Sequence, residues 1–373
     1  MTTDTGERVL ISGASFAGLA SAFWMRRLGY QVTVVELGPG LKRGGAPVYI
    51  RDETIGVVDR MGLMDAVRAK ALPPRTTIFT TLDGTELARS EPELPTTDAT
   101  GDGYEIHRDD LLDILAAATE GDIEMLWGSS VDALTDTGNG VRASFRDGTV
   151  RDFDLVLGCD GAHSTVRRLS FGPESEYNHF LGTYFSVAVV DETFIAPATT
   201  TVANAPGLTA MLNSYDATTD IVLAFRSDHR IAYDHRDVDE QRRILREQLR
   251  STGAHLEDLV DRATRASSFY FDELSQIKMP RWTSGRVALV GDAGYCASPA
   301  AGMGGSLAIL GATALFDALA SAGGDVEGAF AEYEQAFRPV AEHIQHEAEH
   351  VGVPTYFPAT SEELEARNTY LLG

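Results

Sequence analysis

The chain has 373 residues, which suits one large domain or two intimately joined domains and leaves room for a sizeable core and a large cofactor. Its 55 acidic residues outnumber its 31 basic residues, giving a net charge of −24. A surface this acidic repels phosphate backbones and anionic lipids, so nucleic-acid and membrane partners are disfavoured.

The first predicted elements alternate between strand and helix. The apolar pattern predicts a buried strand over residues 8–13, a helix over residues 15–29 and a second strand over residues 31–36. A glycine-containing turn joins the first strand to the helix. Strand, tight turn, helix and strand in this order are typical of the βαβ unit of a dinucleotide-binding fold.

The next part of the chain mixes helices with short strands. The predicted elements are a helix over 53–70, a hairpin over 76–90 that turns at Asp83-Gly84, an amphipathic helix over 108–120, short strands between 122 and 152, and a buried strand over 153–159.

Between residues 178 and 278 the composition changes. Its segments are rich in Val, Ile, Tyr, Phe and Thr, which suit the half-buried surface of a pleated sheet. The predicted strands lie at 183–190, 207–213, 220–226 and 267–274, and the predicted helices at 237–252 and 256–265. This pattern indicates a β-sheet with helices on one side. The first architecture then resumes, with a buried strand at 286–290 and long helices at 304–321 and 325–351.

The turn after the first strand has the spacing of a dinucleotide-binding motif. It reads Gly13-Ala14-Ser15-Phe16-Ala17-Gly18. Gly13 allows the tight turn, Gly18 lets helix and strand pack closely, and the helix N-terminus offers free N–H groups to a pyrophosphate. Ser15 replaces the usual middle glycine. Glu36 ends the second strand where an acid binds the ribose of an adenosine, which favours FAD or NAD over NADP.

Two further motifs follow predicted buried strands. The first is Cys159-Asp160-Gly161-Ala162-His163-Ser164-Thr165-Val166-Arg167. The second is Gly291-Asp292-Ala293-Gly294, followed by Ser298-Pro299-Ala300-Ala301-Gly302-Met303-Gly304-Gly305. Open α/β sheets bind ligands at the carboxyl ends of their strands, so both motifs stand where a cofactor is expected.

With three motifs in this order, the chain resembles the group A flavoprotein aromatic hydroxylases. These single-component FAD-dependent monooxygenases include the p-hydroxybenzoate hydroxylases and, closest in size, the tetracycline-inactivating monooxygenases. The resemblance covers nearly the whole chain. Together with the predicted elements it implies an α/β fold with three parts: a Rossmann-like FAD-binding domain (1–177 and 279–325), an inserted β-sheet substrate domain (178–278) and a C-terminal helical segment (326–373).

The resemblance also implies roles for individual residues. Glu36 would hold the adenosine ribose, Arg108 the pyrophosphate or ribityl chain, and Asp292 the ribityl hydroxyls. Arg43 would lie near the flavin and the nicotinamide donor, while Asp160 and Arg167 would organise the region between FAD and NAD(P)H. The full set of candidate cofactor residues is Gly13, Ser15, Phe16, Ala17, Gly18, Glu36, Arg43, Arg108, Asp160, Arg167, Gly291, Asp292, Pro299, Gly302, Met303, Gly304 and Gly305.

The chemistry implied by the resemblance is carried by the flavin. NAD(P)H reduces FAD, O2 forms a C4a-hydroperoxide, and one oxygen atom hydroxylates or epoxidises a small aromatic or polyketide-like metabolite. Arg43 is the one candidate for a catalytic side chain. Antibiotic inactivation is an alternative. A flavin dehydrogenase or reductase without oxygen insertion is another, because Gly302-Met303-Gly304-Gly305-Ser306 departs from the family pattern Gly-Gln-Gly-x-Asn.

The substrate is expected between the flavin and the sheet of residues 178–278. Candidate lining residues are Tyr184, Phe185, Met211, Asn213, Phe225 and Phe271, each of which also suits ordinary core packing.

No metal site is expected. His346-Glu347-Ala348-Glu349-His350 matches the HExxH pattern, but the polar helix around it favours a solvated face. Two cysteines, a polar N-terminal segment and the lack of an apolar run of about 18 residues favour the cytoplasm. We expect a monomer or weak homodimer whose partners are a small-molecule substrate and O2.

Overall fold

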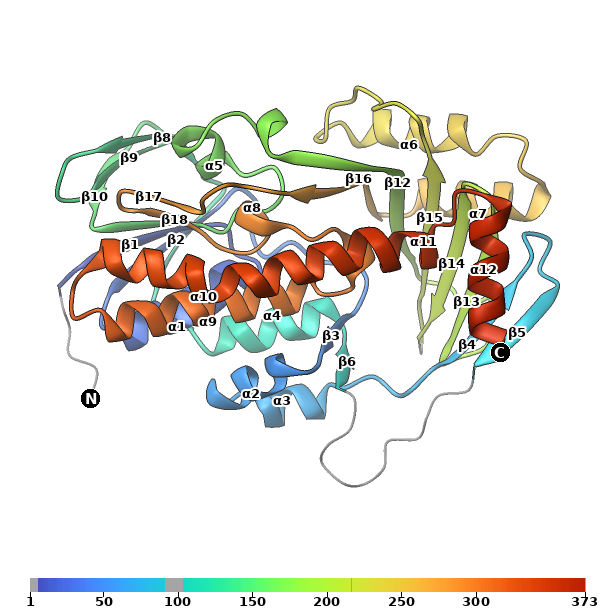
Figure 1. Cartoon of the computed structure of the whole chain (residues 1–373), viewed down its shortest axis with the longest axis horizontal. Coiled ribbons are helices and arrows are strands. Elements are labelled where there is room, and N and C mark those ends of the chain that lie inside the picture. Colours follow the sequence, from blue (N-terminus) through green and yellow to red (C-terminus); the bar gives the residue numbers. More distant parts are fainter. Residues whose placement is uncertain (1–5, 91–102, 216, 373) are drawn as a thin grey trace.

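Two β-sheets organise the computed structural model, which describes residues 6–90, 103–215 and 217–372 (Figure 1). A six-stranded sheet has the order β17-β18-β11-β1-β2-β7, and a seven-stranded sheet has the order β16-β12-β15-β14-β13-β4-β5. Residues 1–5, which belong to the polar N-terminal segment that favoured the cytoplasm, lie outside the described part. This architecture confirms the predicted α/β fold with a second sheet beside the first.

The six-stranded sheet contains the predicted βαβ unit. Its strands are β1 (Arg8–Ser12), β2 (Gln31–Glu36), β7 (Glu124–Trp127), β11 (Leu155–Gly158), β17 (Thr283–Ser284) and β18 (Val287–Leu289). All pair in parallel except β17, which is antiparallel to β18. A parallel sheet is covered on both faces, so its strands are continuous apolar runs. Val9, Leu10 and Ile11 in β1 are accordingly fully buried.

Helices cover one face of this sheet (Figure 1). They are α1 (Phe16–Arg27), α4 (Arg108–Ala117), α9 (Gly304–Ser321) and α10 (Val326–Glu347). By length and composition α9 is apolar enough to cross a membrane, so the expectation that the chain has no apolar run of about 18 residues was wrong. More than half of that stretch is buried in the protein, however, and the helix packs against both α1 and α10, as a core helix does.

Smaller elements complete this half of the molecule. On the other side of the six-stranded sheet lie a three-stranded antiparallel sheet and a short helix: β8 (Val131–Asp136), β9 (Val141–Phe145), β10 (Val150–Phe153) and α5 (Thr165–Ser170). A two-stranded sheet joins β3 (Val48–Ile50) to β6 (Tyr104–Ile106).

The helix predicted over 53–70 is two helices in the structure, α2 (Glu53–Arg60) and α3 (Met64–Ala69). Gly62 separates them with a φ of +77°, the left-handed conformation that commonly ends helices.

The seven-stranded sheet is larger than the predicted insertion. Its strands are β4 (Thr76–Thr80), β5 (Glu86–Ser90), β12 (Asn178–Val190), β13 (Thr199–Ala205), β14 (Leu208–Ser214), β15 (Thr219–Arg226) and β16 (Ser268–Ile277). The hairpin of β4 and β5 joins it because β4 pairs in parallel with β13. Residues 76–90 therefore lie in this sheet, although the sequence placed them with the FAD-binding segments. Helices α6 (Val238–Gln248) and α7 (Ala254–Arg265) share an apolar core with one face of the sheet.

The C-terminal segment connects the two halves. After α10 come a π-helical turn η3 (Ala348–Gly352), α11 (Val353–Tyr356) and α12 (Ser361–Leu372), which packs against β13. Gly352 lies so close to the turn η2 (Pro299–Ala301) that a Cβ there would come within 2.3 Å of the Ala300 carbonyl oxygen. The last part of the chain thus supports the loop that precedes α9.

Candidate functional site

Four neighbouring strands, β18, β11, β1 and β2, end at one edge of the six-stranded sheet. Gly291 comes shortly after β18, Asp160 shortly after β11, Gly13 directly after β1, and Glu36 is the last residue of β2. The structure therefore brings together motifs that lie far apart in the sequence. Ligands of open α/β sheets bind at this kind of edge.

The turn after β1 has no room for a side chain at its two glycines. Gly13 has a φ of +103°, and a Cβ there would lie 2.4 Å from the Cys159 carbonyl oxygen. A Cβ on Gly18 would lie 1.9 Å from the carbonyl oxygen of Gly13. Helix α1 begins at Phe16 with no acidic residue in its first turn. Its free N–H groups and the positive end of its dipole suit a pyrophosphate.

Arg108 lies over this turn. Its Nη2 donates a hydrogen bond to Ser15 Oγ at 3.1 Å, and its Nη1 donates to the Lys42 carbonyl oxygen at 2.7 Å. Its guanidinium carbon is 5.3 Å from the centre of the Phe16 ring. Burial lowers the pKa of Arg108, although the group stays charged. A partly buried guanidinium beside a helix N-terminus is a good partner for phosphate oxygens.

The Glu36 carboxylate is held at the same edge by two backbone donors. The N–H of Ala14 donates to it at 2.9 Å and the N–H of Gly38 at 2.8 Å. These bonds fix the carboxylate beside the glycine turn, which is the position expected for an acid that binds an adenosine ribose.

Arg43 does not join this group. Its side chain is half exposed and pairs with Asp113 on α4 at 2.6 Å. The chain turns at Gly44 and Gly45, which have φ values of +83° and +102°, and the Gly44 N–H is held by the Asp109 carboxylate. These bonds direct the Arg43 side chain to the outer surface of α4, so its position near the flavin stays a prediction.

Lys42 points the other way and is a residue that sequence reasoning missed. Its Nζ lies 5.1 Å from the centre of the Tyr270 ring on β16. Burial, reinforced by the charge of Arg108, lowers its pKa, while Asp272 and Glu36 act in the opposite direction. Lys42 thus adds positive charge between the glycine turn and the seven-stranded sheet. The signal was its place directly before Arg43, which the sequence had already indicated as a candidate.

Asp160 and Arg167 hold the backbone of the site in place by hydrogen bonds to main-chain groups. The Asp160 carboxylate accepts hydrogen bonds from the N–H groups of Thr165 at 2.8 Å and Val166 at 3.1 Å, which caps α5. Arg167 is fully buried, and it donates to the carbonyl oxygen of Ala293 at 3.0 Å. Arg167 therefore joins the motif after β11 to the motif after β18.

Asp292 begins the short helix α8 (Asp292–Tyr295). Burial raises the pKa of this carboxyl, while the Cys296 thiol and the charge of Arg108 act in the opposite direction. It therefore keeps acceptor capacity for hydroxyl groups of a ligand. Gly291, just before it, has a φ of +70°, and a Cβ there would come within 2.9 Å of the Ala17 Cβ.

The loop from Pro299 to Gly305 leads into α9. Pro299, Gly302 and Gly304 are exposed, whereas Met303 and Gly305 are buried. Gly302 has a φ of +62°, which allows the chain to reverse before the helix. Helix α9 has no acidic residue in its first turn, so its N-terminus favours the negative charge of a reduced flavin ring.

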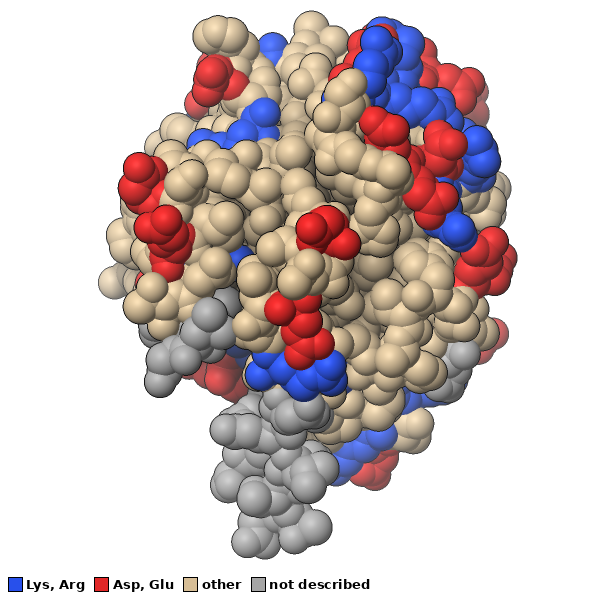
Figure 2. Space-filling view, turned by 90° about the vertical axis from the view of Figure 1, so that its right-hand side faces the viewer, with Lys and Arg blue, Asp and Glu red and all other residues tan. Residues whose placement is uncertain are grey.

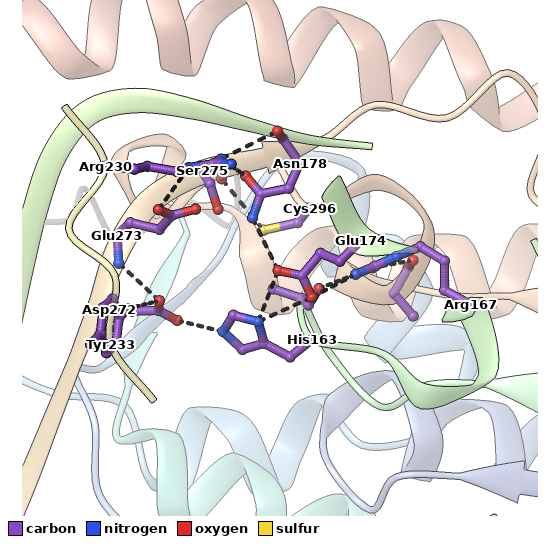
Figure 3. Close-up of polar contacts among 12 residues, drawn as sticks. His163, Arg167, Glu174, Asn178, Arg230, Tyr233, Asp272, Glu273, Ser275 and Cys296 are labelled. Atoms are coloured by element: carbon purple, nitrogen blue, oxygen red, sulfur yellow. Dashed lines mark hydrogen bonds and ion pairs between the residues drawn. The ribbon is translucent and has the colours of Figure 1, made fainter. Parts of the chain in front are cut away.

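A polar network links this edge to the seven-stranded sheet (Figure 3). Glu174 accepts from Arg167 at 3.2 Å, and the His163 imidazole lies between Glu174 at 3.1 Å and Asp272 at 3.3 Å. Asp272 also accepts from the hydroxyls of Tyr233 and Tyr270. The hydrogen bond to Asp272, followed by that to Glu174, raises the pKa of His163 to about 10, so its ring is charged at neutral pH.

The predicted substrate residues divide between the two faces of the sheet. Tyr184, Phe225 and Phe271 are almost fully buried in the core shared with α6 and α7. Phe185 faces the opposite side, in a smaller core with Ala300. Ala300 belongs to the loop from Pro299 to Gly305, here called the flavin-motif loop. Because side chains alternate along a strand, Met211 and Asn213 also lie on the side opposite to their neighbours Ala210 and Leu212 of the α6–α7 core. The assignment of Tyr184, Phe225 and Phe271 to a substrate cavity is thus corrected.

The histidines of the HExxH pattern lie side by side at the end of the last long helix. The rings of His346 and His350 lie 4.3 Å apart, and Glu349 pairs with Lys278 at 2.9 Å. In the described ranges no group of three or more His, Cys, Asp or Glu side chains is placed to hold a metal ion.

Comparison with known proteins agrees with this geometry. The family described as "FAD binding domain" matches residues 7–348. The chain belongs to this family, the group A flavoprotein hydroxylases. It is an FAD-dependent monooxygenase with a small-molecule substrate and O2, as its named relatives indicate.

Three relatives show how far the likeness extends. A protein of Mycobacterium tuberculosis without an assigned function is 39% identical over 96% of both chains. A flavin-dependent monooxygenase from an unknown prokaryotic organism is 34% identical over 98% of this chain and 95% of its own length. The crystal structure of tetracycline destructase Tet(51) is 30% identical, with a TM-score of 0.86 over 98% of this chain and 95% of the other.

The residues present fit FAD. Gly13 and Gly18 allow a backbone approach that a Cβ would block, Arg108 supplies a cation, and Asp292 retains acceptor capacity. Bound FAD supplies the redox chemistry with NAD(P)H and O2, which amino-acid side chains lack. The chain's own task is to orient the ring, exclude water and hold the substrate.

Proposed function

We propose that the chain holds FAD at the edge formed by the glycine turn, Glu36, Arg108, Asp292 and the loop from Pro299 to Gly305. With NAD(P)H as electron donor, the enzyme hydroxylates or epoxidises a small aromatic or polyketide-like metabolite. The substrate lies against the side of the seven-stranded sheet that carries Met211 and Asn213.

The observation that supports this proposal most directly is the small core around Ala300. Ala300, from the loop before α9, packs with Phe185, Ala224 and Leu274 of the sheet. A ring held by that loop is therefore next to this side of the sheet. Apolar side chains there suit a flat aromatic skeleton, and the polar side chains among them suit its oxygen or nitrogen substituents.

The test begins with the purified protein. We expect the absorbance of bound FAD, its bleaching by NAD(P)H without air, and faster O2 uptake when a phenolic or polycyclic polyketide compound is added. Mass spectrometry should then show a product with one added oxygen atom. Reduction of the flavin by NAD(P)H without any product across the panel would instead support a flavin dehydrogenase or reductase.

A second candidate is the inactivation of a tetracycline antibiotic. The similarity to tetracycline destructase Tet(51) extends over nearly the whole length of both chains, which favours it. Loss of tetracycline absorbance during NAD(P)H oxidation, and growth protection of a susceptible strain that expresses the chain, would support this candidate. Turnover of simple phenols without either effect would exclude it.

We further propose a cytoplasmic monomer or weak homodimer that binds neither nucleic acid nor membrane. The net charge of −24 supports this proposal. On the end of the molecule drawn in Figure 2, acidic and basic side chains of the described residues are interspersed, with no broad basic area. Light scattering together with chromatography would measure the oligomeric state.

A further inference from the structure

A buried carboxyl group on the seven-stranded sheet has no role in the contacts described so far. Asp220 is in β15 and only 3% exposed. Its neighbours Ile221, Leu223 and Phe225 face α6 and α7, whereas Ala224 belongs to the core around Ala300. Alternation along the strand places Asp220 on the same side as Ala224, which is the side toward the flavin-motif loop.

Burial and the charges of Arg75 and Glu105 act on the Asp220 carboxyl, and no hydrogen bond from a described residue reaches it, although the residue is more than nine-tenths buried. Its cross-strand neighbour Asn213 is occupied in part, because the Asn213 side-chain oxygen accepts from Thr200 at 2.9 Å. A buried carboxylate without a donor is costly for the folded protein, so its position points to a donor that arrives with a ligand.

Three side chains lie near Asp220. Arg75 forms an ion pair with Glu105, and both side chains are 14% exposed. Arg75 also donates to the Tyr215 hydroxyl at 2.7 Å. Arg75 favours the charged form of Asp220 and Glu105 opposes it. With all three side chains ionised, the cluster carries one excess negative charge. Burial raises the pKa of Asp220 to about 7, the effect expected of an uncompensated buried carboxylate.

This cluster adjoins the flavin-motif loop. Glu105 in β6 lies opposite Tyr49 in β3 in the register of the two-stranded sheet. The Tyr49 carbonyl oxygen accepts a hydrogen bond from the Ser306 hydroxyl, in the first turn of α9, at 2.9 Å. The Tyr215 ring is 4.7 Å from the ring of His107, the residue before Arg108. A molecule between the flavin and the sheet is therefore within reach of Asp220.

We propose that Asp220, supported by Glu105 and Arg75, forms a subsite for a protonated amine, so that the preferred substrate is an aromatic or polyketide-like compound with a cationic nitrogen. This inference rests on the proposed position of the substrate. A cationic N–H donor would both hydrogen-bond the Asp220 carboxylate and neutralise the excess charge. A hydrogen bond between charged groups in a buried site has the strength to give about a tenfold or larger preference for the amine.

The experiment compares two probes that differ in the amine. Tetracycline carries a dimethylamino group, and 4-dedimethylaminotetracycline lacks it. Their dissociation constants for the FAD-loaded enzyme are measured from the change in flavin absorbance at about pH 8, above the pKa of Asp220. We expect the wild type to bind tetracycline at least about tenfold more tightly than its analogue.

Two variants and a matched control assign the preference to the cluster. Asp220→Asn keeps the shape and removes the charge, and Glu105→Gln removes the other negative charge of the cluster. Asp220→Asn should reduce the preference to within about twofold, since a charged hydrogen bond becomes a neutral one. Glu105→Gln should reduce the preference by a smaller factor, because Arg75, freed from its ion pair, then opposes a cationic ligand. Asp228→Asn alters an exposed residue that follows the same strand, and it should keep the full preference.

Each outcome is decisive. Equal binding of the two probes by the wild type, or an unchanged preference in Asp220→Asn, overturns the amine subsite. So does failure to bind either probe by an enzyme that still holds FAD and oxygenates a neutral phenol, which leaves the proposed function intact. Failure to bind FAD, or to oxygenate any compound of the panel, instead defeats the proposed function.

Discussion

In the six-stranded sheet the candidate cofactor residues follow the ends of neighbouring parallel strands, whereas in the seven-stranded sheet the candidate substrate residues lie along the strands. At the first sheet the backbone forms much of the site, through the turn at Gly13 and the N-termini of α1 and α9. At the second sheet the candidate site is formed by side chains, and alternate residues along a strand face opposite sides of the sheet. The role of a glycine motif can therefore be inferred from its position after a strand. Whether a residue within a strand contacts the substrate depends on which face of the sheet its register gives it.

The largest effect should come from filling the backbone turn. Gly13→Ala places a Cβ against the Cys159 carbonyl at a positive φ, so FAD binding should weaken at least about 100-fold. Gly40→Ala is the control, because a Cβ there meets no atom within 4 Å. Fluorescence titration with FAD measures both variants. Retention of normal affinity by Gly13→Ala would contradict a cradle made of backbone.

The two sides of the seven-stranded sheet can be separated by a pair of truncations. Phe225→Ala removes a ring from the core with α6 and α7, and should lower the free energy of unfolding by about 3–5 kcal/mol with little change in substrate affinity for the enzyme that remains folded. Met211→Ala should have a smaller effect on stability but weaken substrate binding several-fold. Urea unfolding and substrate titration provide the measurements, and reversed effects would show that the faces are wrongly assigned.

The two arginines near α4 provide a sharper test of the cofactor site. Arg108→Met should weaken FAD binding by about 10- to 100-fold, because it removes a partly buried cation beside the α1 N-terminus. Arg43→Met should change FAD affinity by less than about twofold, since this arginine pairs with Asp113 at the surface. Equal losses in both variants would mean that Arg43 moves to the cofactor when FAD binds.

The smallest effect concerns the network that joins the two halves. The pKa of His163 is raised from 6.5 to about 10, so its stabilising contribution is present in full below pH 6.5 and is lost as the pH rises through about 10. His163→Gln should therefore reduce the free energy of unfolding by about 2 kcal/mol near neutral pH, after allowance for solvent screening. The difference from wild type should shrink toward pH 10.

The control for this network is His255→Gln, at an exposed position outside the network. It should leave the free energy of unfolding unchanged across the same pH range. A His163→Gln variant whose deficit does not depend on pH would show that the imidazole contributes by packing and not by charge.

The sequence alone determined the elements and motifs that depend on local interactions. Helix α9 has the bounds predicted for it, and the turn Gly13–Gly18 was recognised because its glycines and Glu36 follow a fixed spacing along one βαβ unit. Such features need only the chain's own backbone geometry and the apolar period of each element. The family and the FAD cofactor followed from three of them in order.

Tertiary structure alone decided which side chains meet. The hairpin of β4 and β5 joins the second sheet through pairing with β13, a contact between segments more than a hundred residues apart. Register and strand alternation turned Tyr184, Phe225 and Phe271 toward α6 and α7 and left Met211, Asn213 and Asp220 on the other side. Loop hydrogen bonds directed Arg43 outward and Lys42 toward β16. None of these contacts leaves a periodic pattern in the chain, because each depends on where a distant segment packs.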